Sequence, residues 1–182
     1  MRASPSELAD YWQNGHALLR AHWYLRSATL GSRVRVWGEP HIKNQGTIVI
    51  GPRVRLMSVV AKLEIGVGPE GRLEIGEGTF INHGTSIAAT ESVRIGAYCN
   101  IGTYVLIMDN DFHRIEPERR NEWPESAPIV IEENVWLGAK AVVLRGVTIG
   151  AGSVVGAGSV VVNDIPARSL AVGVPARVVR TL

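Results

Sequence analysis

The sequence predicts an all-β solenoid of hexapeptide repeats, with a short N-terminal helix and one protruding loop. The first observation is a six-residue period of branched aliphatic residues in the second half of the chain. The residues in this frame are Ile95, Ile101, Ile107, Ile131, Leu137, Val143, Ile149, Val155 and Val161. The second is composition: glycine directly follows five of these residues, and the chain has 20 glycines but only 6% aromatic residues. Many glycines and few large rings favour a thin, tightly coiled core.

A period of six fits neither a helix nor a simple alternating strand. It fits short strands joined by tight corners, with one aliphatic side chain per strand pointing inward. Three such strands close a triangular coil of about 18 residues, and stacked coils share one core. Glycine is expected where the backbone bends or crowds at the corners. Small or medium residues lie two positions before each aliphatic, and one of them, Cys99, is predicted to be a buried structural thiol.

The period is less regular in the first half of the chain. One run keeps it in a shifted frame, at Ile75, Ile81 and Ile87. Earlier still, the dipeptides Ile50-Gly51 and Ile65-Gly66 recur with uneven spacing, which we interpret as turns lengthened by loops or bulges. The predicted β-helix domain covers residues 31–182.

Residues 1–30 are predicted to form a helical cap. Ser4 is a candidate N-cap, with Pro5 at the first helical position and Glu7 three residues after the cap. Apolar residues recur at helical spacing to about Arg26, and Gly31 ends the pattern. Solenoids need a terminal cap over their last apolar layer, so we favour that role. The alternative is an amphipathic helix that lies on a membrane surface.

The repeat stops between residues 107 and 131, and the excursion 109–128 mixes acidic and basic side chains. A long departure from a regular solenoid is typical of a functional segment. This one carries His113, and histidine suits a general base because its ordinary pKa is near neutrality. Asp109 or Asp111 could orient the imidazole, although surface charge is the simpler interpretation of both.

Two further segments have candidate binding residues. Asn82 and His83 follow a repeat aliphatic, where an asparagine at a corner could instead satisfy its own backbone. The C-terminal tail, residues 163–182, has three arginines against one aspartate, and arginines bind phosphate groups.

Composition excludes several other classes. The net charge is only +2, so a nucleic-acid partner is not indicated. A single cysteine permits no intrachain disulfide. We see no signal peptide and no apolar stretch long enough to span a membrane, so a cytoplasmic location is expected.

The motifs that carry the repeat resemble those of the hexapeptide-repeat acyltransferases. They are Ile95-Gly96-Ala97-Tyr98-Cys99-Asn100-Ile101-Gly102, Asn134-Val135-Trp136-Leu137-Gly138, Gly146-Val147-Thr148-Ile149-Gly150 and Gly173-Val174-Pro175-Ala176-Arg177. The resemblance covers residues 31–182, and its nearest branch is the sugar O-acetyltransferases of glycan (polysaccharide) biosynthesis, similar to galactoside and maltose acetyltransferases. It implies a left-handed parallel β-helix, acetyl-CoA as acyl donor, and a homotrimer with active sites between subunits.

The resemblance also implies roles for individual residues. His113 matches the catalytic base of the family, and Asn82 matches an asparagine that contacts the acceptor. We expect His83 and Asp111 on the acceptor side as well. On the coenzyme A side, five residues match family positions: Trp136 beside the pantetheine arm, Ala139 and Ala157 along its tunnel, and Arg177 and Arg180 at the nucleotide end.

Two other classes of function are disfavoured by the sequence. Carbonic anhydrases of the gamma type use a similar coil with three zinc-binding histidines, but the five histidines here include two in the N-terminal helix and no close pair in the coils. A non-catalytic solenoid, such as an ice-binding protein or a scaffold, is disfavoured because the threonines form no rank and the excursion would have no purpose. Among acyltransferases, transfer to a sugar hydroxyl leads, and transfer to an amino group of a nucleotide sugar is the runner-up. The acceptor, the acyl length and the pathway stay open.

Overall fold

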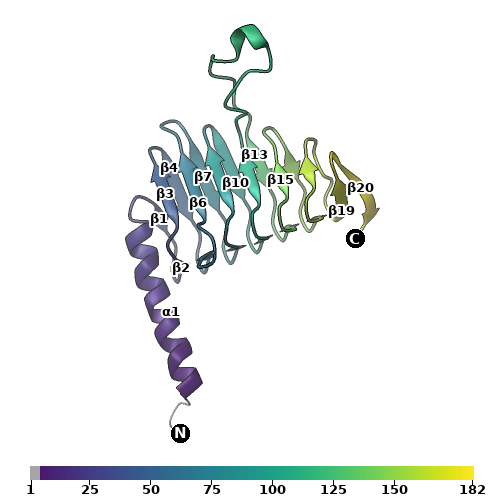
Figure 1. The fold of residues 1–182 in the computed structure, drawn as a ribbon. Helices are drawn as coiled ribbons and strands as arrows, with labels where there is room; N and C mark the ends of the chain where they lie inside the picture. Colours follow the sequence, from purple (N-terminus) through teal and green to yellow (C-terminus); the bar gives the residue numbers. More distant parts are fainter. Residues whose placement is uncertain (1–4) are drawn as a thin grey trace.

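The computed structural model describes the backbone from Pro5 to Leu182 and the side chains from Gly15 onward. It is a left-handed parallel β-helix (Figure 1). Successive strands belong to the first, second and third of three sheets in turn, so each coil has three sides. The predicted fold class is therefore confirmed. The candidate N-cap Ser4 lies outside the described residues.

The three sheets form the three sides of a prism, and the strands of each sheet lie side by side along its length. The first sheet contains β1 (Thr29–Leu30), β4 (Thr47–Ile50), β7 (Arg72–Ile75), β10 (Ser92–Ile95), β13 (Ile129–Ile131) and β16 (Thr148–Ile149). The second contains β2 (Arg35–Gly38), β5 (Arg55–Ser58), β8 (Phe80–Ile81), β11 (Asn100–Ile101), β14 (Trp136–Leu137), β17 (Val154–Val155), β19 (Ser169–Gly173) and β20 (Ala176–Thr181). The third contains β3 (His41–Asn44), β6 (Glu64–Val67), β9 (Ser86–Ala89), β12 (Leu106–Met108), β15 (Val142–Val143) and β18 (Val160–Val161).

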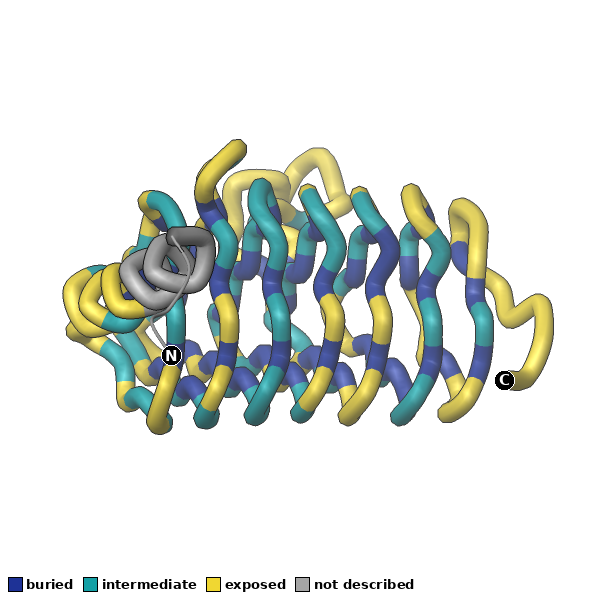
Figure 2. Tube along the Cα trace, turned by 90° about the horizontal axis from the view of Figure 1, so that it is seen from below, coloured by how far each residue is buried: buried dark blue, intermediate teal, exposed yellow. Residues whose placement is uncertain are grey.

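Equivalent residues of successive coils stack directly on one another. Ile95 of β10 pairs with Ile75 of β7 on one side and with Ile131 of β13 on the other. Every pairing between the named strands of the described chain is parallel except β19 with β20, which is antiparallel and closes the C-terminal end. Rows of buried positions consequently run the length of the prism (Figure 2).

The aliphatic frame forms the core as predicted. All nine residues of the frame are buried, and so are all nine residues two positions earlier, including Cys99. Most strands of this frame bury one side chain, as predicted, and in those coils the buried residue two positions earlier lies just before the strand, as Val135 does before β14. Removing an isoleucine or valine side chain from water contributes about 1.5–3 kcal/mol, so this double row is the main stabilising feature.

Glycines at the corners face the backbone of the next coil. A Cβ on Gly96 would lie 2.6 Å from backbone atoms of residues 132 and 133, which leaves no room for a side chain. Gly66 is different: it lies inside β6, and a Cβ there would meet nothing within 4 Å. The lengthened turns that we inferred near Ile50-Gly51 and Ile65-Gly66 are present, because Ile50 pairs with Ile75 and Ile65 with Ile87, which makes both coils longer than the regular coil of about 18 residues.

The helix α1 (Pro5–Tyr24) projects from the first coil, and its C-terminal half packs there (Figure 1). Ala17, Ala21 and Leu25 are buried, and the Arg20 Nη1 donates to the carbonyl oxygen of Gly38 at 2.8 Å. No helix in the described part of the chain is long and apolar enough to cross a bilayer.

Candidate active site

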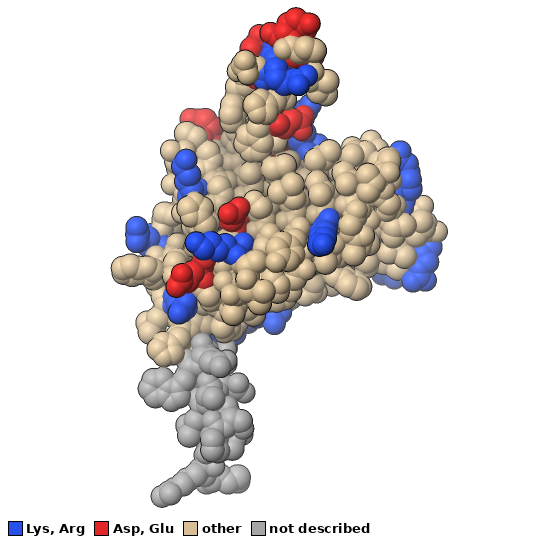
Figure 3. All heavy atoms as spheres, viewed as in Figure 1, with Lys and Arg blue, Asp and Glu red and all other residues tan. Residues whose placement is uncertain are grey.

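The excursion leaves the prism at the edge between the third and first sheets. It connects β12 with β13, contains one short 3-10 turn (η1, Pro117–Arg119), and protrudes from the coils (Figure 1). Acidic and basic side chains gather on its surface, which Figure 3 shows in red and blue.

The base of the excursion is fixed by two buried polar residues. The Asp109 carboxylate is fully buried and accepts hydrogen bonds from the backbone N–H groups of residues 90, 91 and 92 at 2.7–3.0 Å. The Asn110 amide donates to the Pro124 carbonyl oxygen at 3.2 Å and to the Ser126 hydroxyl at 2.8 Å, and its Oδ1 accepts from the Phe112 N–H. The interpretation of Asp109 as surface charge was therefore wrong. Sequence reasoning missed Asn110, although an Asx pair at the end of a repeat run signals side-chain hydrogen bonds to backbone.

His113 is exposed on the excursion, and its Nδ1 lies 3.1 Å from the carbonyl oxygen of Arg120. Because a carbonyl oxygen only accepts, this contact places the proton of the neutral imidazole on Nδ1 and leaves Nε2 free to take a proton. Neither aspartate orients the ring, since Asp111 instead forms an ion pair with Arg145 at 2.6 Å.

Asn82 and Trp136 lie in one hollow on the outer face of the second sheet. The hollow measures about 370 Å³ and is also lined by Phe80 and Asn100. The Asn82 Oδ1 accepts a hydrogen bond from the backbone N–H of His83 at 2.9 Å, which fixes the amide and leaves its NH₂ group to donate. Trp136 is 55% exposed, so its ring face is available to a ligand.

Next to this hollow runs the edge between the second and third sheets. Backbone hydrogen bonds connect its corners in order, from residue 104 to His83, from residue 140 to residue 103, and from residue 158 to Ala139. Ala139 and Ala157 both sit on this edge, so small side chains line it for two coils. The His83 ring packs edge-to-face against Tyr104, with 5.9 Å between centroids, and is half-buried.

The C-terminal arginines lie at the far end of the same sheet. Arg177 and Arg180 belong to β20, which pairs with β19, and both are exposed. Together, the residues expected to contact coenzyme A thus share the second sheet and one of its edges.

A single chain does not bring all of the candidate residues together. Asn82 and Trp136 belong to the second sheet, whereas His113 leaves from the edge between the third and first sheets. These two regions are separated by the width of the third sheet.

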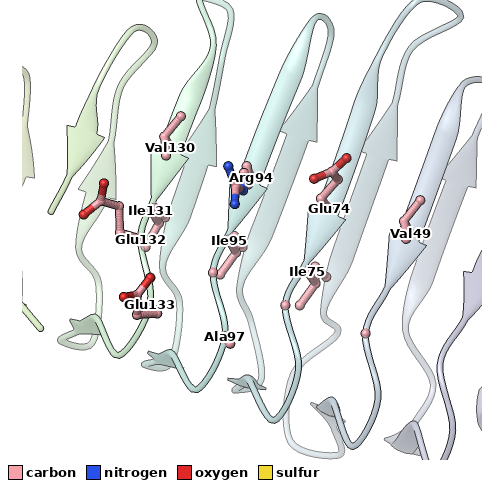
Figure 4. Close-up of a pocket in the computed structure, with 13 residues that line it drawn as sticks. Val49, Glu74, Ile75, Arg94, Ile95, Ala97, Val130, Ile131, Glu132 and Glu133 are labelled. Atoms are coloured by element: carbon pink, nitrogen blue, oxygen red, sulfur yellow. The ribbon is translucent and has the colours of Figure 1, made fainter. Parts of the chain in front are cut away.

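A hollow of about 510 Å³ lies elsewhere, on the outer face of the first sheet (Figure 4). Its charged residues are Glu74, Arg94, Glu132 and Glu133. It contains none of the predicted site residues. Among the described residues, no group of three or more His, Cys, Asp or Glu side chains is placed to hold a metal ion.

Comparison with known proteins identifies the family. A family model for the bacterial transferase hexapeptide (six repeats) matches residues 128–163. A hexapeptide-repeat acetyltransferase from Vibrio cholerae O1 biovar eltor, solved with acetyl coenzyme A, is 31% identical over 99% of this chain and 91% of its own, with a TM-score of 0.65. The chain belongs to the hexapeptide-repeat acetyltransferase family.

Galactoside acetyltransferases are also similar to this chain. A galactoside acetyltransferase solved with coenzyme A is 29% identical over 99% of this chain and 74% of its own, with a TM-score of 0.61. The galactoside O-acetyltransferase of Lactococcus lactis is 37% identical over 111 residues, which are 60% of this chain and 53% of that relative. The family member described here thus spans about half the length of the curated relatives it matches.

Proposed function

We propose that this protein transfers an acetyl group from acetyl-CoA to a hydroxyl group of a sugar or glycan precursor. The observation that carries the proposal is the His113 imidazole, whose Nδ1 is held by a backbone carbonyl while Nε2 is free. Support also comes from the family, in which a relative solved with acetyl coenzyme A aligns over nearly the whole chain, and from the galactoside acetyltransferases among the similar proteins.

The second sheet has features suited to binding acetyl-CoA, the acyl donor. The alanine-lined edge at Ala139 and Ala157 leaves room for an extended pantetheine arm, and Trp136 offers a flat apolar surface beside it. At the end of the sheet, Arg177 and Arg180 provide guanidinium groups for phosphates. Asn82, with a free amide NH₂ group, lies where it can hold the acceptor hydroxyl.

The complete site is proposed to form between copies of the chain in a homotrimer. The third sheet is bounded on one side by the alanine-lined edge and on the other by the edge that bears His113. Its outward positions are apolar in the last three strands, as at Leu106, Val142 and Val160, whereas β3, β6 and β9 also present polar residues there, such as Glu64 and Ser86. Packing of this face around a threefold axis would bring His113 of one copy to the hollow of the next.

The proposed reaction is direct attack in a ternary complex. Nε2 of His113 removes the proton from the acceptor hydroxyl as its oxygen attacks the thioester carbonyl carbon. A backbone N–H at a corner can stabilise the negative charge that develops on the carbonyl oxygen. The C–S bond then breaks, the acetyl ester is released, and the imidazolium returns its proton to the coenzyme A thiolate.

The test compares the turnover of His113→Ala with that of the parent, using acetyl-CoA and a panel of sugars, nucleotide sugars and amino sugars. Turnover is measured as release of the coenzyme A thiol. Loss of a general base should lower kcat by about 10²–10⁴-fold. His22→Ala is the matched control, because His22 is an exposed histidine on α1, outside the proposed site, and its Nδ1 likewise lies close to a backbone carbonyl oxygen, 2.9 Å from that of Leu18. Turnover by His113→Ala within a few-fold of the parent would refute the role of His113. Faster transfer to an amine than to any hydroxyl would replace the O-acetyl proposal with N-acetylation.

A further inference from the structure

The outer face of the second sheet carries arginines without carboxylates. Its strands contain Arg35, Arg55, Arg177 and Arg180, and no aspartate or glutamate occurs in any of them. The tail arginines are accounted for by the proposed donor site. Arg35 and Arg55, at the opposite end, are not.

Arg35 and Arg55 are direct neighbours in the parallel ladder of β2 and β5. Adjacent strands lie about 4.8 Å apart, so two positive side chains stand side by side, an arrangement that is normally destabilising. Neither forms an ion pair with a carboxylate of the described residues, and the Nε of Arg35 is buried with no hydrogen-bond partner.

The first sheet shows how the same fold neutralises arginine elsewhere. Arg72 forms an ion pair with Glu74 at 2.5 Å, and Arg94 stands beside Glu74 in the ladder of β7 and β10 (Figure 4). The first sheet thus places a carboxylate beside each of these two arginines. Arg35 and Arg55 have no such carboxylate beside them in the ladder of the second sheet.

The pair connects directly to the hollow of the proposed acceptor site. The Arg55 guanidinium lies over the Phe80 ring, 5.1 Å from its centroid, and Arg55 is the ladder neighbour of Phe80. Phe80 lines the hollow with Asn82 and Trp136. The two guanidinium groups thus lie one and two coils from the hollow, on the order of 5 and 10 Å along the prism.

We propose that Arg35 and Arg55 bind an oxyanion on the acceptor, so that the substrate is an anionic sugar with a carboxylate or phosphate about 5–10 Å from its reacting hydroxyl. This proposal rests on the proposed function. Guanidinium groups match both anions with paired hydrogen bonds, and the Phe80 ring holds one of them in place.

Turnover tests the proposal with three acceptors that differ only in the group at C6, which is neutral in glucose and anionic in glucuronate and glucose 6-phosphate, each with acetyl-CoA. We expect kcat/KM for at least one anionic sugar to exceed that for glucose at least tenfold, since a hydrogen bond to a charged group contributes about 1.5–3 kcal/mol. The uronate and phosphate arms distinguish the two anions. Arg35→Gln and Arg55→Gln should each reduce the anionic-to-neutral ratio at least fivefold. Arg94→Gln, the same charge change on the first sheet, should leave the ratio unchanged.

Anion binding without acetyl-CoA tests the site separately. The comparison is made in the Arg177→Gln/Arg180→Gln double variant, because the proposed donor site would itself bind phosphates. Glucuronate or inorganic pyrophosphate should raise the Tm of this double variant, with or without Arg94→Gln, but not after Arg35→Gln/Arg55→Gln is added to it. If no acceptor is turned over while this pattern holds, the proposed function fails and the anion site stands.

Three results would overturn the inference. The first is an equal ratio of anionic to neutral turnover in the parent and in Arg55→Gln. The second is a Tm shift that survives when Arg35→Gln/Arg55→Gln is added to the Arg177→Gln/Arg180→Gln variant. The third is a change in the oligomeric state of Arg35→Gln/Arg55→Gln, measured by light scattering. Such a change would mean that Arg35 and Arg55 face acidic residues of another copy of the chain.

Discussion

The buried carboxylate of Asp109 should be a main support of the excursion. It accepts hydrogen bonds from three successive backbone N–H groups, those of Thr90, Glu91 and Ser92, at the corner between β9 and β10. The backbone carbonyl of Asp109 also accepts from the N–H of Ala127, which closes the excursion at its base. Replacing Asp109 by alanine removes the side-chain hydrogen bonds that connect this corner to the start of the His113-bearing segment.

The cost of Asp109→Ala follows from these contacts. An N–H that loses a buried acceptor costs about 1–3 kcal/mol, and water can reach this corner from one side, so we take the low end for each of three groups. The free energy of unfolding should fall by about 3 kcal/mol. For a chain of 182 residues that corresponds to a Tm lower by about 6–12 °C.

The matched control is Asp164→Ala. Its carboxylate accepts one exposed hydrogen bond, from the Thr148 N–H at 2.7 Å, so its loss should cost less than about 1 kcal/mol. Urea unfolding and calorimetry should be run at equal protein concentration, because subunit association would shift the Tm. If Asp109→Ala costs no more than Asp164→Ala, the reasoning about buried acceptors is wrong.

Three further predictions concern the coils and the tail. Gly96→Ala should lower stability by about 1–3 kcal/mol because its Cβ meets the next coil, whereas Gly66→Ala should be neutral or stabilising by about 0.5–1 kcal/mol; equal urea midpoints would contradict this. Burial raises the pKa of the Cys99 thiol above 9.0, so a thiol reagent at pH 8 should react with it only after unfolding. The contribution of this thiol to the free energy of unfolding should be lost as the pH rises beyond 9. Fast labelling of the folded protein would disprove the burial of a neutral thiol. Arg177→Gln/Arg180→Gln should raise the KM for acetyl-CoA about tenfold with little change in kcat, and an unchanged KM would remove the tail from the donor site.

Much of the fold could be predicted because the hexad repeats a local rule. An aliphatic every six residues with glycine after it leaves few alternatives to a three-sided coil, and the structure buries every residue of that frame. Gly66 shows the limit of the rule, since a dipeptide alone does not reveal whether a strand ends at the glycine or continues for one more residue.

The sequence predicted which residue types the candidate site contains, but not which contacts those residues make. The sequence pointed to His113 because it lies where the repeat breaks, but not to the carbonyl of Arg120, seven residues away, that fixes the tautomer. Nor did the sequence distinguish Asp109 from Asp111. One is buried beneath a corner of the preceding coil and the other pairs with Arg145, and both partners come from distant parts of the chain.

The sequence by itself determined that the protein is a coil of short strands with one excursion, because the period of its aliphatic residues is set by local geometry. Only the tertiary structure decided which side chains share a face. Residues of one face are a whole coil apart in sequence, so Arg35 and Arg55 become neighbours, and Phe80, Asn82 and Trp136 line one hollow, only once the strands stack. The same stacking leaves His113 at another edge of the prism.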